Sequence, residues 1–233
     1  MGSAARIRVW DLPTRLCHWL LAASCLAAFV TGFVGGNLMD RHGQAGLAIV
    51  GLVVFRIVWG FAGSTHARFA NFVRGPAAIR AYLRGEWRGL GHNPLGALSV
   101  LGLLGLAVFQ AGSGLFGNDD IAFNGPLYAL VSKETSDFLT GLHHKTVWLL
   151  LALVGLHLAA IAFYLRFRGD NLVKPMLTGW KEVPATAAER TQGGGVAALV
   201  LAVGIGALAV YAASGALLPP PAAVTPASAA PAW

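Results

Sequence analysis

The sequence predicts an all-α fold, an integral membrane bundle of helices. Of the 233 residues, 56% are hydrophobic and only 12% are charged, which is too apolar for an ordinary soluble domain. Several stretches approach the roughly 20 apolar residues that a helix needs to cross a bilayer. Helices are expected because backbone amides in lipid must be hydrogen-bonded within their own segment. The predicted spans are 16–34, 43–61, 95–116, 143–165 and 196–218.

The positive charges lie in short segments beside these spans, where they indicate orientation. Arginines lie in the lead 1–15 and in the second connection, 61–93, whereas the connection before 143 is acidic. The segment that follows the fourth span is basic again, with Arg166, Arg168, Lys174 and Lys181, and the connection 169–195 leads on to the fifth span. We therefore expect a multi-pass membrane protein with a cytoplasmic N-terminus and an external C-terminus. The net charge of +7 forms no single basic face, so membrane lipid is the expected partner and nucleic acid is not.

The elements follow in order from local signals. Asp11 and Pro13 suit the first turn of a helix. In the second connection, arginines alternate with aromatic residues, which predicts a helix lying on the membrane surface. The fourth span is expected to extend as a helix over 132–140. The fifth span contains no ionisable residue, so it anchors or packs, and the Pro/Ala-rich tail 219–233 is expected to be a disordered external segment.

Four histidines stand out because ionisable residues are costly inside a membrane. His143 and His157 are fourteen residues apart, so they point to within roughly 40° of one another and lie roughly 21 Å apart along the helix. His144 should face nearly the opposite way. Spans one and four run antiparallel, which places His18 at the level of His157, and span two starts on the outer side, which places His42 at the level of His143.

Two bis-histidine sites, stacked across the membrane in the four-helix region 16–168, therefore follow from the spacing. Imidazole is a common axial ligand of haem iron. No C-x-x-C-H motif is present to attach haem covalently, so any haem is b-type. A single interfacial histidine, such as His18 beside Trp19, would mean little alone, but four at two matching depths point to ligation.

Two further residues are candidates for contact with such cofactors. Arg56 lies fourteen residues after His42 on the same face, where it would either reach the inner headgroups or pair with a haem propionate. Gly32 lies fourteen residues after His18 on the same face of the helix. Because glycine has no side chain, a flat macrocycle could approach the helix closely there. His92, at the start of span three, is a weaker candidate for a quinone or a propionate.

At these residues the sequence resembles the bacterial cytochrome b561 family, especially its relatives that serve as the membrane b-type subunit of nickel-iron hydrogenases. The likeness covers roughly residues 6–180. It rests on VWDLPTRLCHW at 9–19, RHGQAG at 41–46, FRIVWG at 55–60, LHHK at 142–145 and HLAA at 157–160. The resemblance implies that His18 and His157 hold one haem b and that His42 and His143 hold a second. The fifth span and the tail lie outside the family's basic four-helix pattern.

We therefore expect transmembrane electron transfer between a quinone pool and a redox partner such as a cytochrome c or a hydrogenase. An autonomous quinone reductase, taking electrons from a small reductant such as superoxide, is an alternative that the sequence does not separate. A metal or ion permease is disfavoured because no polar ladder joins the two levels. A structural anchor is disfavoured because it would not need histidines inside the membrane.

Overall fold

The computed structural model describes residues 4–87, 89–184 and 191–219 and confirms the helical bundle. Within that part of the chain, five helices are long and apolar enough to cross a membrane. They are α1 (Leu12–Val34), α2 (Met39–Ala62), α5 (Pro94–Leu115), α6 (Lys133–Phe167) and α8 (Gly195–Ala213).

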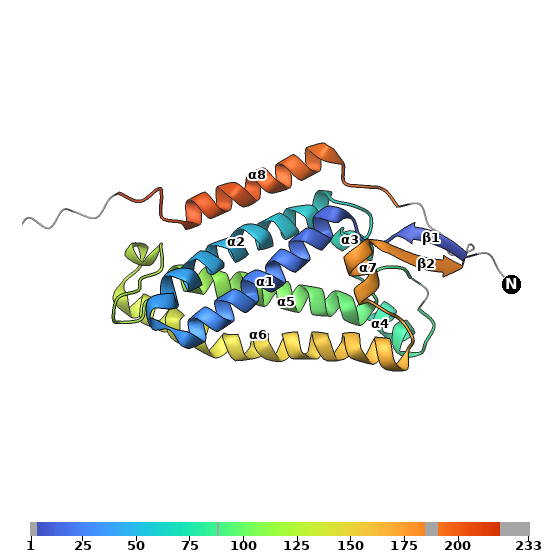
Figure 1. The fold of residues 1–233 in the computed structure, drawn as a ribbon, viewed down its shortest axis with the longest axis horizontal. Helices are drawn as coiled ribbons and strands as arrows, with labels where there is room; N and C mark the ends of the chain where they lie inside the picture. The colour runs from blue at the N-terminus through green and yellow to red at the C-terminus, as the bar shows by residue number, and fades with distance from the viewer. Residues whose placement is uncertain (1–3, 88, 185–190, 220–233) are drawn as a thin grey trace, which may run out of the picture.

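Helices α1, α2, α5 and α6 lie side by side as a four-helix core, and α8 lies along the outside of α2 (Figure 1). Small residues allow α8 to approach α2 closely. A Cβ on Gly206 would lie 3.0 Å from the carbonyl oxygen of Gly51, and a Cβ on Gly51 would lie 2.7 Å from Val210. The fifth helix is therefore packed against the core, although it is not part of it.

The helix ends follow capping chemistry. Asp11 Oδ1 accepts a hydrogen bond from Thr14 N at 2.9 Å, and Pro13 occupies the first turn of α1. Ser132 caps α6, which begins at Lys133, so the predicted extension of span four is present. Helix α8 ends at Ala213, earlier than the predicted 218, and the chain then turns at Gly215 with φ +78°. Residues 220–233, most of the predicted tail, lie outside the described residues.

One end of the bundle, which we call the sheet end, carries a small antiparallel sheet that the sequence did not reveal (Figure 1). Strand β1 (Ala4–Arg8) pairs with β2 (Trp180–Pro184), so the lead is tied to the segment that follows α6. The short helices at this end are α3 (Phe69–Phe72), α4 (Pro76–Leu83) and α7 (Val173–Thr178). The sheet covers a small apolar core built on Ile7, Val9, Trp10 and Val183.

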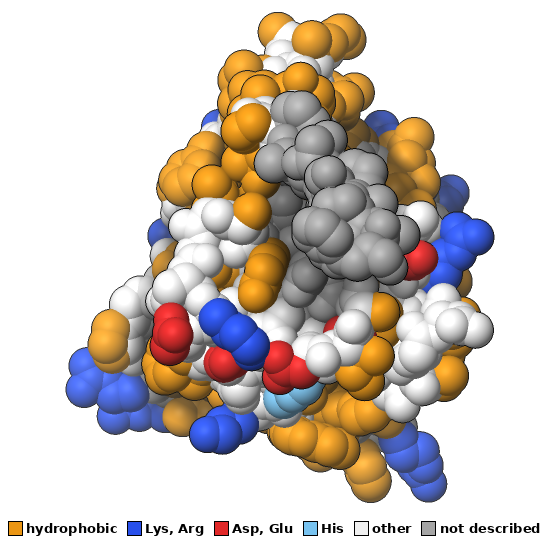
Figure 2. All heavy atoms as spheres, turned by 90° about the vertical axis from the view of Figure 1, so that its left-hand side faces the viewer, with side chains coloured by type: hydrophobic (Ala, Val, Ile, Leu, Met, Phe, Trp, Pro, Cys, Tyr) orange, Lys and Arg blue, Asp and Glu red, His pale blue; other side chains and the backbone are white. Residues whose placement is uncertain are grey.

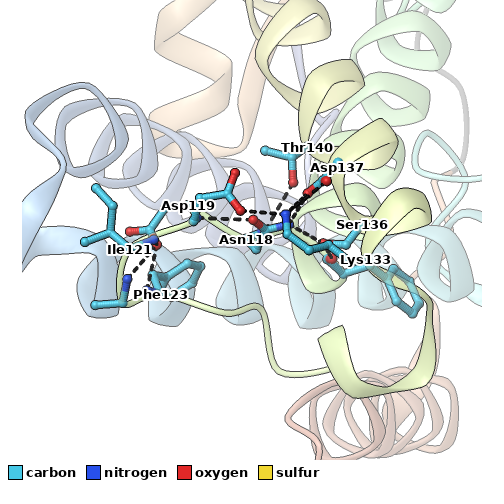
Figure 3. Close-up of polar contacts among 11 residues, drawn as sticks. Asn118, Asp119, Ile121, Phe123, Lys133, Ser136, Asp137 and Thr140 are labelled. Atoms are coloured by element: carbon cyan, nitrogen blue, oxygen red, sulfur yellow. Dashed lines mark hydrogen bonds and ion pairs between the residues drawn. The ribbon is translucent and has the colours of Figure 1, made fainter.

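The opposite end, which we call the loop end, is formed by two connections. One joins α1 to α2 through the 3₁₀ turn η1 (Gly36–Leu38), and the other joins α5 to α6 and contains the 3₁₀ turn η2 (Tyr128–Leu130). Asp119 Oδ1 accepts hydrogen bonds from the N–H groups of Ile121, Ala122 and Phe123 (Figure 3). These backbone hydrogen bonds lower the pKa of the Asp119 carboxyl group. The hydrogen bond from Ile121 has the largest effect, followed by that from Phe123. The connection is thus a folded cover rather than a loose loop.

The same cover is fastened to the start of α6. Asn118 Nδ2 donates to Ser136 Oγ at 2.6 Å and to Asp137 Oδ1 at 3.0 Å. Lys133 pairs with Asp120 at 2.6 Å and with Asp137 at 2.9 Å. Figure 2 shows acidic and basic side chains side by side on this face, bordered by apolar side chains.

Candidate functional site

The four candidate histidines form two facing pairs in the structure. His42 on α2 and His143 on α6 form the loop-end pair, with ring centroids 5.9 Å apart. His18 on α1 and His157 on α6 form the sheet-end pair, with ring centroids 6.5 Å apart. The pairing and the two levels are those that helical spacing predicts. His144 is exposed and belongs to neither pair, although it borders the space beside the loop-end pair.

The loop-end rings are held by backbone carbonyl groups. His42 Nδ1 lies 2.9 Å from the carbonyl oxygen of Ala28, and His143 Nδ1 lies 2.9 Å from that of Gln110. Because a carbonyl oxygen only accepts, each Nδ1 carries the proton and each Nε2 keeps a lone pair. Histidines that bind a metal commonly show this arrangement, with the second ring N–H donated to a carbonyl group.

Gln110 on α5 fixes the turn of α6 that carries His143. Its Nε2 donates to the carbonyl oxygen of His143 at 3.0 Å, and its Oε1 accepts from Thr146 Oγ1 at 2.7 Å. Ser113 Oγ lies 3.2 Å from His143 Nδ1. The sequence signal for these contacts was a single glutamine three residues before a serine in an apolar span. The hydrogen bond to His143 Nδ1, however, is accepted by the backbone carbonyl group of Gln110, and every residue has such a group.

Glycines make room for the loop-end rings. A Cβ at Gly32 would lie 2.8 Å from His42 Nδ1, and a Cβ at Gly114 would lie 3.1 Å from His143 Cε1. Gly32 therefore packs directly against the ring of His42, whereas the sequence suggested only that it would lie beside a macrocycle. Beside these rings lies a cavity of about 510 Å³, and Asp119, Ile121 and Phe123 of the folded cover help to line it.

The sheet-end pair has different surroundings. His18 Nδ1 is buried and has no hydrogen-bond partner in the part of the chain that the structure describes. The ring of His18 meets Trp19 edge-on at 5.0 Å between centroids. Trp19 Nε1 in turn donates to the carbonyl oxygen of Met176 at 3.3 Å, so the segment after α6 lies next to this pair.

Arg56 lies near the sheet end of α2 and is buried, with 8% of its surface exposed. Its Nη1 donates to the carbonyl oxygen of Ala67 at 3.2 Å, and its guanidinium lies over the ring of Phe69. It does not snorkel to the surface, which was the alternative for this residue. Among the described residues, Arg56 makes no hydrogen bond to either imidazole of the sheet-end pair.

The spacing of both pairs fits the two axial positions of a haem. With metal–nitrogen bonds of about 2 Å and the radius of an imidazole ring on each side, two rings on opposite faces of one iron should have centroids about 6 Å apart. The observed 5.9 Å and 6.5 Å lie on either side of that value. The free Nε2 atoms at the loop end and the adjoining cavity also suit a ligated macrocycle.

Comparison with known proteins gives a consistent result. A family model described as prokaryotic cytochrome b561 matches residues 9–179. A curated relative from Azotobacter vinelandii, named a probable Ni/Fe-hydrogenase B-type cytochrome subunit, is 27% identical over 75% of this chain and 88% of its own length. Relatives with the same name from Bradyrhizobium diazoefficiens and Cupriavidus necator are 24% and 26% identical, over 76% and 74% of this chain and 86% of their own lengths. No solved structure matches the chain significantly.

Proposed function

Because the chain belongs to the prokaryotic cytochrome b561 family, a family of membrane proteins that transfer electrons by b-type haem, we propose that it holds two such haems and carries electrons across the membrane. His18 and His157 ligate one haem, and His42 and His143 ligate the other. The observation that carries this proposal is the occurrence of two facing imidazole pairs on helices that span the bundle. The other proposed contacts are Arg56 with a propionate and Gly32 beside the loop-end haem.

Bound haem b supplies one-electron exchange at its iron. The chain's own residues set the geometry for it. His143 and His157 share α6, so one helix fixes the separation between the two sites at roughly 21 Å along its axis. Ala28 and Gln110 hold the loop-end imidazoles in one tautomer, and Phe123 of the folded cover lines the adjoining cavity.

We propose a cytoplasmic sheet end and an external loop end in a bacterial inner membrane, on the strength of the arginines in the lead and in the second connection. Quinone in the membrane is one electron-exchange partner. A hydrogenase-type protein is the other, because three relatives are named as subunits of Ni/Fe-hydrogenases. The folded cover at the loop end is its proposed docking face.

The proposal is tested in liposomes that contain the purified chain. Ferricyanide is trapped inside, and dithionite, which does not cross the bilayer, is added outside. We expect ferricyanide reduction in the wild-type vesicles, its loss in His143→Ala and His157→Ala, and its retention in His144→Ala, which exchanges a histidine of the same helix outside both pairs. A colourless protein, or equal rates in all four preparations, would refute the proposal.

The partner is tested in native membranes. If hydrogen gas reduces the b-type absorption bands, and a hydrogenase co-purifies with the chain, the hydrogenase assignment holds. Reduction only by quinol, together with co-purification of a cytochrome c, would replace the hydrogenase with that carrier.

A further inference from the structure

Arg56 is a buried cation with unused hydrogen-bond donors. A guanidinium has five N–H groups. The bond from Nη1 to the carbonyl oxygen of Ala67 is the one hydrogen bond that Arg56 makes within the part of the chain that the structure describes. Its other neighbour is the face of the Phe69 ring, 5.1 Å from the guanidinium carbon. A buried charge is costly without an ionic partner, so the remaining donors require an acceptor.

Asp11 is the acidic residue whose charge reaches Arg56, but both of its oxygens are engaged elsewhere. Oδ1 caps α1 by accepting from Thr14 N at 2.9 Å, and Oδ2 accepts from Trp59 Nε1 at 3.1 Å. Among the described residues, no ion pair joins Asp11 to Arg56. The protein itself therefore leaves the charge of Arg56 without a bonded counter-ion over those residues.

His92 borders the same region from the start of α5. Its ring lies between Trp10 and Phe72, with centroid distances of 4.6 Å to each. Its Nδ1 is buried and has no hydrogen bond over residues 4–87, 89–184 and 191–219. Burial first, and then the charge of Arg56 and those of three histidines, lowers the pKa of His92 to about 3, so the ring is neutral near pH 7. The three histidines are His66, His157 and His18.

The position of His92 is fixed by its neighbour. Asn93 Oδ1 caps α5 by accepting from Gly96 N at 2.8 Å, while Asn93 Nδ2 donates to Tyr164 Oη at 2.8 Å. Tyr164 lies seven residues after His157 on α6, and therefore on the same face of that helix. The contact of Asn93 with Tyr164 therefore ties the segment that carries His92 to the face of α6 that also carries His157.

We propose that Arg56 and His92 form a carboxylate-binding site, and that its occupant is a propionate of the haem at the sheet-end pair. This inference rests on the proposed function. A carboxylate is an acceptor with two oxygens, which suits the paired N–H groups of a guanidinium and the single N–H of a neutral imidazole. The sequence had suggested Arg56 as a partner of a propionate, and it had left His92 between a quinone and a propionate.

Among the described residues that line the cavity beside the loop-end pair, there is no comparable pairing of a buried cation with an imidazole. Lys and Arg are absent from the residues that line its cavity, and Asp119 is the charged carboxylate among them. The carboxylates of a haem bound there gain no buried cation from the described lining. The proposal therefore predicts that only one of the two haems depends on its carboxylate groups.

The direct test uses the full-length chain, freed of haem, and compares haem b with its dimethyl ester, in which both carboxylates are blocked. His143→Ala isolates the sheet-end site, and His157→Ala isolates the loop-end site. In His143→Ala we expect the ester to bind roughly tenfold to a hundredfold more weakly than haem b, the range expected for losing hydrogen bonds to a charged group. In His157→Ala we expect the two ligands to bind within about threefold of each other.

A second arm changes the protein. Arg56→Gln should lower both the occupancy and the midpoint potential of the sheet-end haem, and Arg56→Lys should restore part of each. His92→Phe should weaken haem b more than its ester at the same site. Arg84→Gln is the matched control, because it removes the same charge from an exposed residue at the same end of the molecule.

Equal binding of haem b and its ester in His143→Ala would overturn the proposal, and so would an Arg56→Gln chain with unchanged haem occupancy and potential. If Arg56→Gln does not fold, the ester comparison decides alone, since it needs no change at Arg56. Loss of bound phospholipid phosphorus from Arg56→Gln, with equal binding of ester and haem, would assign the site to a lipid headgroup and reject the propionate. A wild-type chain that binds no haem would refute the proposed function instead.

Discussion

The two histidine pairs carry the same donor atoms in different settings. At the loop end, both rings are held through Nδ1 by the carbonyl groups of Ala28 and Gln110, and they pack against glycines. At the sheet end, His18 Nδ1 has no partner among the described residues, and the surroundings are basic and aromatic. The loop-end pair is thus fixed by the chain alone, whereas the sheet-end pair has surroundings suited to an anionic ligand.

The contrast implies a division of electrostatic roles. A buried cation beside a redox centre favours its reduced, more negative state, and a low local dielectric strengthens that effect. Arg56 is buried toward the sheet end of α2, and Asp119 lines the cavity beside the loop-end pair. We therefore expect the two haems to differ in midpoint potential, with the order set by how fully a propionate neutralises Arg56.

The largest expected effect comes from removing one ligand of each pair. His157→Ala should lose the sheet-end haem and His143→Ala the loop-end haem, so each variant should hold about half of the wild-type haem per chain. The pyridine haemochromogen assay on purified protein measures this directly. Loss of both haems from a single, correctly folded variant would show that the sites are not independent.

The next effect concerns the glycine beside His42. A methyl group on Gly32 would come within 2.8 Å of His42 Nδ1, so Gly32→Ala should displace the ring and break its bond to Ala28. We expect roughly tenfold weaker haem binding at the loop end, in line with the loss of an outer hydrogen bond on a metal ligand. Gly105→Ala is the control, because a Cβ there meets nothing within 4 Å. Equal haem titrations for the two variants would contradict the contact.

A pH effect distinguishes the sheet end. The pKa of His92 is lowered in the folded chain to about 3, while the unfolded value is near 6.5. Between these two pKa values, His92 is protonated in the unfolded haem-free chain and neutral in the folded one. The free energy of unfolding of the haem-free protein should therefore not depend on His92 above about pH 6.5. It should fall, by at most about 1.4 kcal/mol per pH unit, as the pH drops from 6.5 toward 3.

Thermal unfolding of the haem-free chain in detergent at several pH values measures this effect. His92→Gln keeps a polar side chain and removes the titration, so its melting temperature should fall less over the same range. Parallel curves for the two proteins would mean that His92 is not the group responsible.

The smallest effect is expected at Ser113. Ser113→Ala removes an oxygen 3.2 Å from His143 Nδ1, but the carbonyl group of Gln110 remains as acceptor at 2.9 Å. We expect a change in loop-end haem affinity worth about 1 kcal/mol or less, which is typical of a single neutral hydrogen bond. A haem titration that showed complete loss would indicate that Ser113, rather than Gln110, orients His143.

Much of the fold could be predicted because hydropathy and length are local properties. The five spans, the extension of α6 and the levels of the four histidines all follow from helical geometry. The β1 and β2 strands could not be found, because five residues each, paired across more than 170 positions, leave no periodic signal.

The site was partly visible for the same reason. Histidine is conspicuous in an apolar span, so His18, His42, His143 and His157 could be named. The carbonyl groups of Ala28 and Gln110 could not, since every residue has one, and only the packing of neighbouring helices selects those two. The neighbourhood of Arg56 and His92 also depends on a tertiary approach between the segments after α2 and before α5.

The most direct test of the account is electron paramagnetic resonance of the oxidised, purified chain with its haem counted against protein. We expect two low-spin ferric signals of the bis-imidazole type per chain, one of which disappears in His143→Ala and the other in His157→Ala. A single signal, a high-spin signal in the wild-type protein, or the same signal lost from both variants would contradict it.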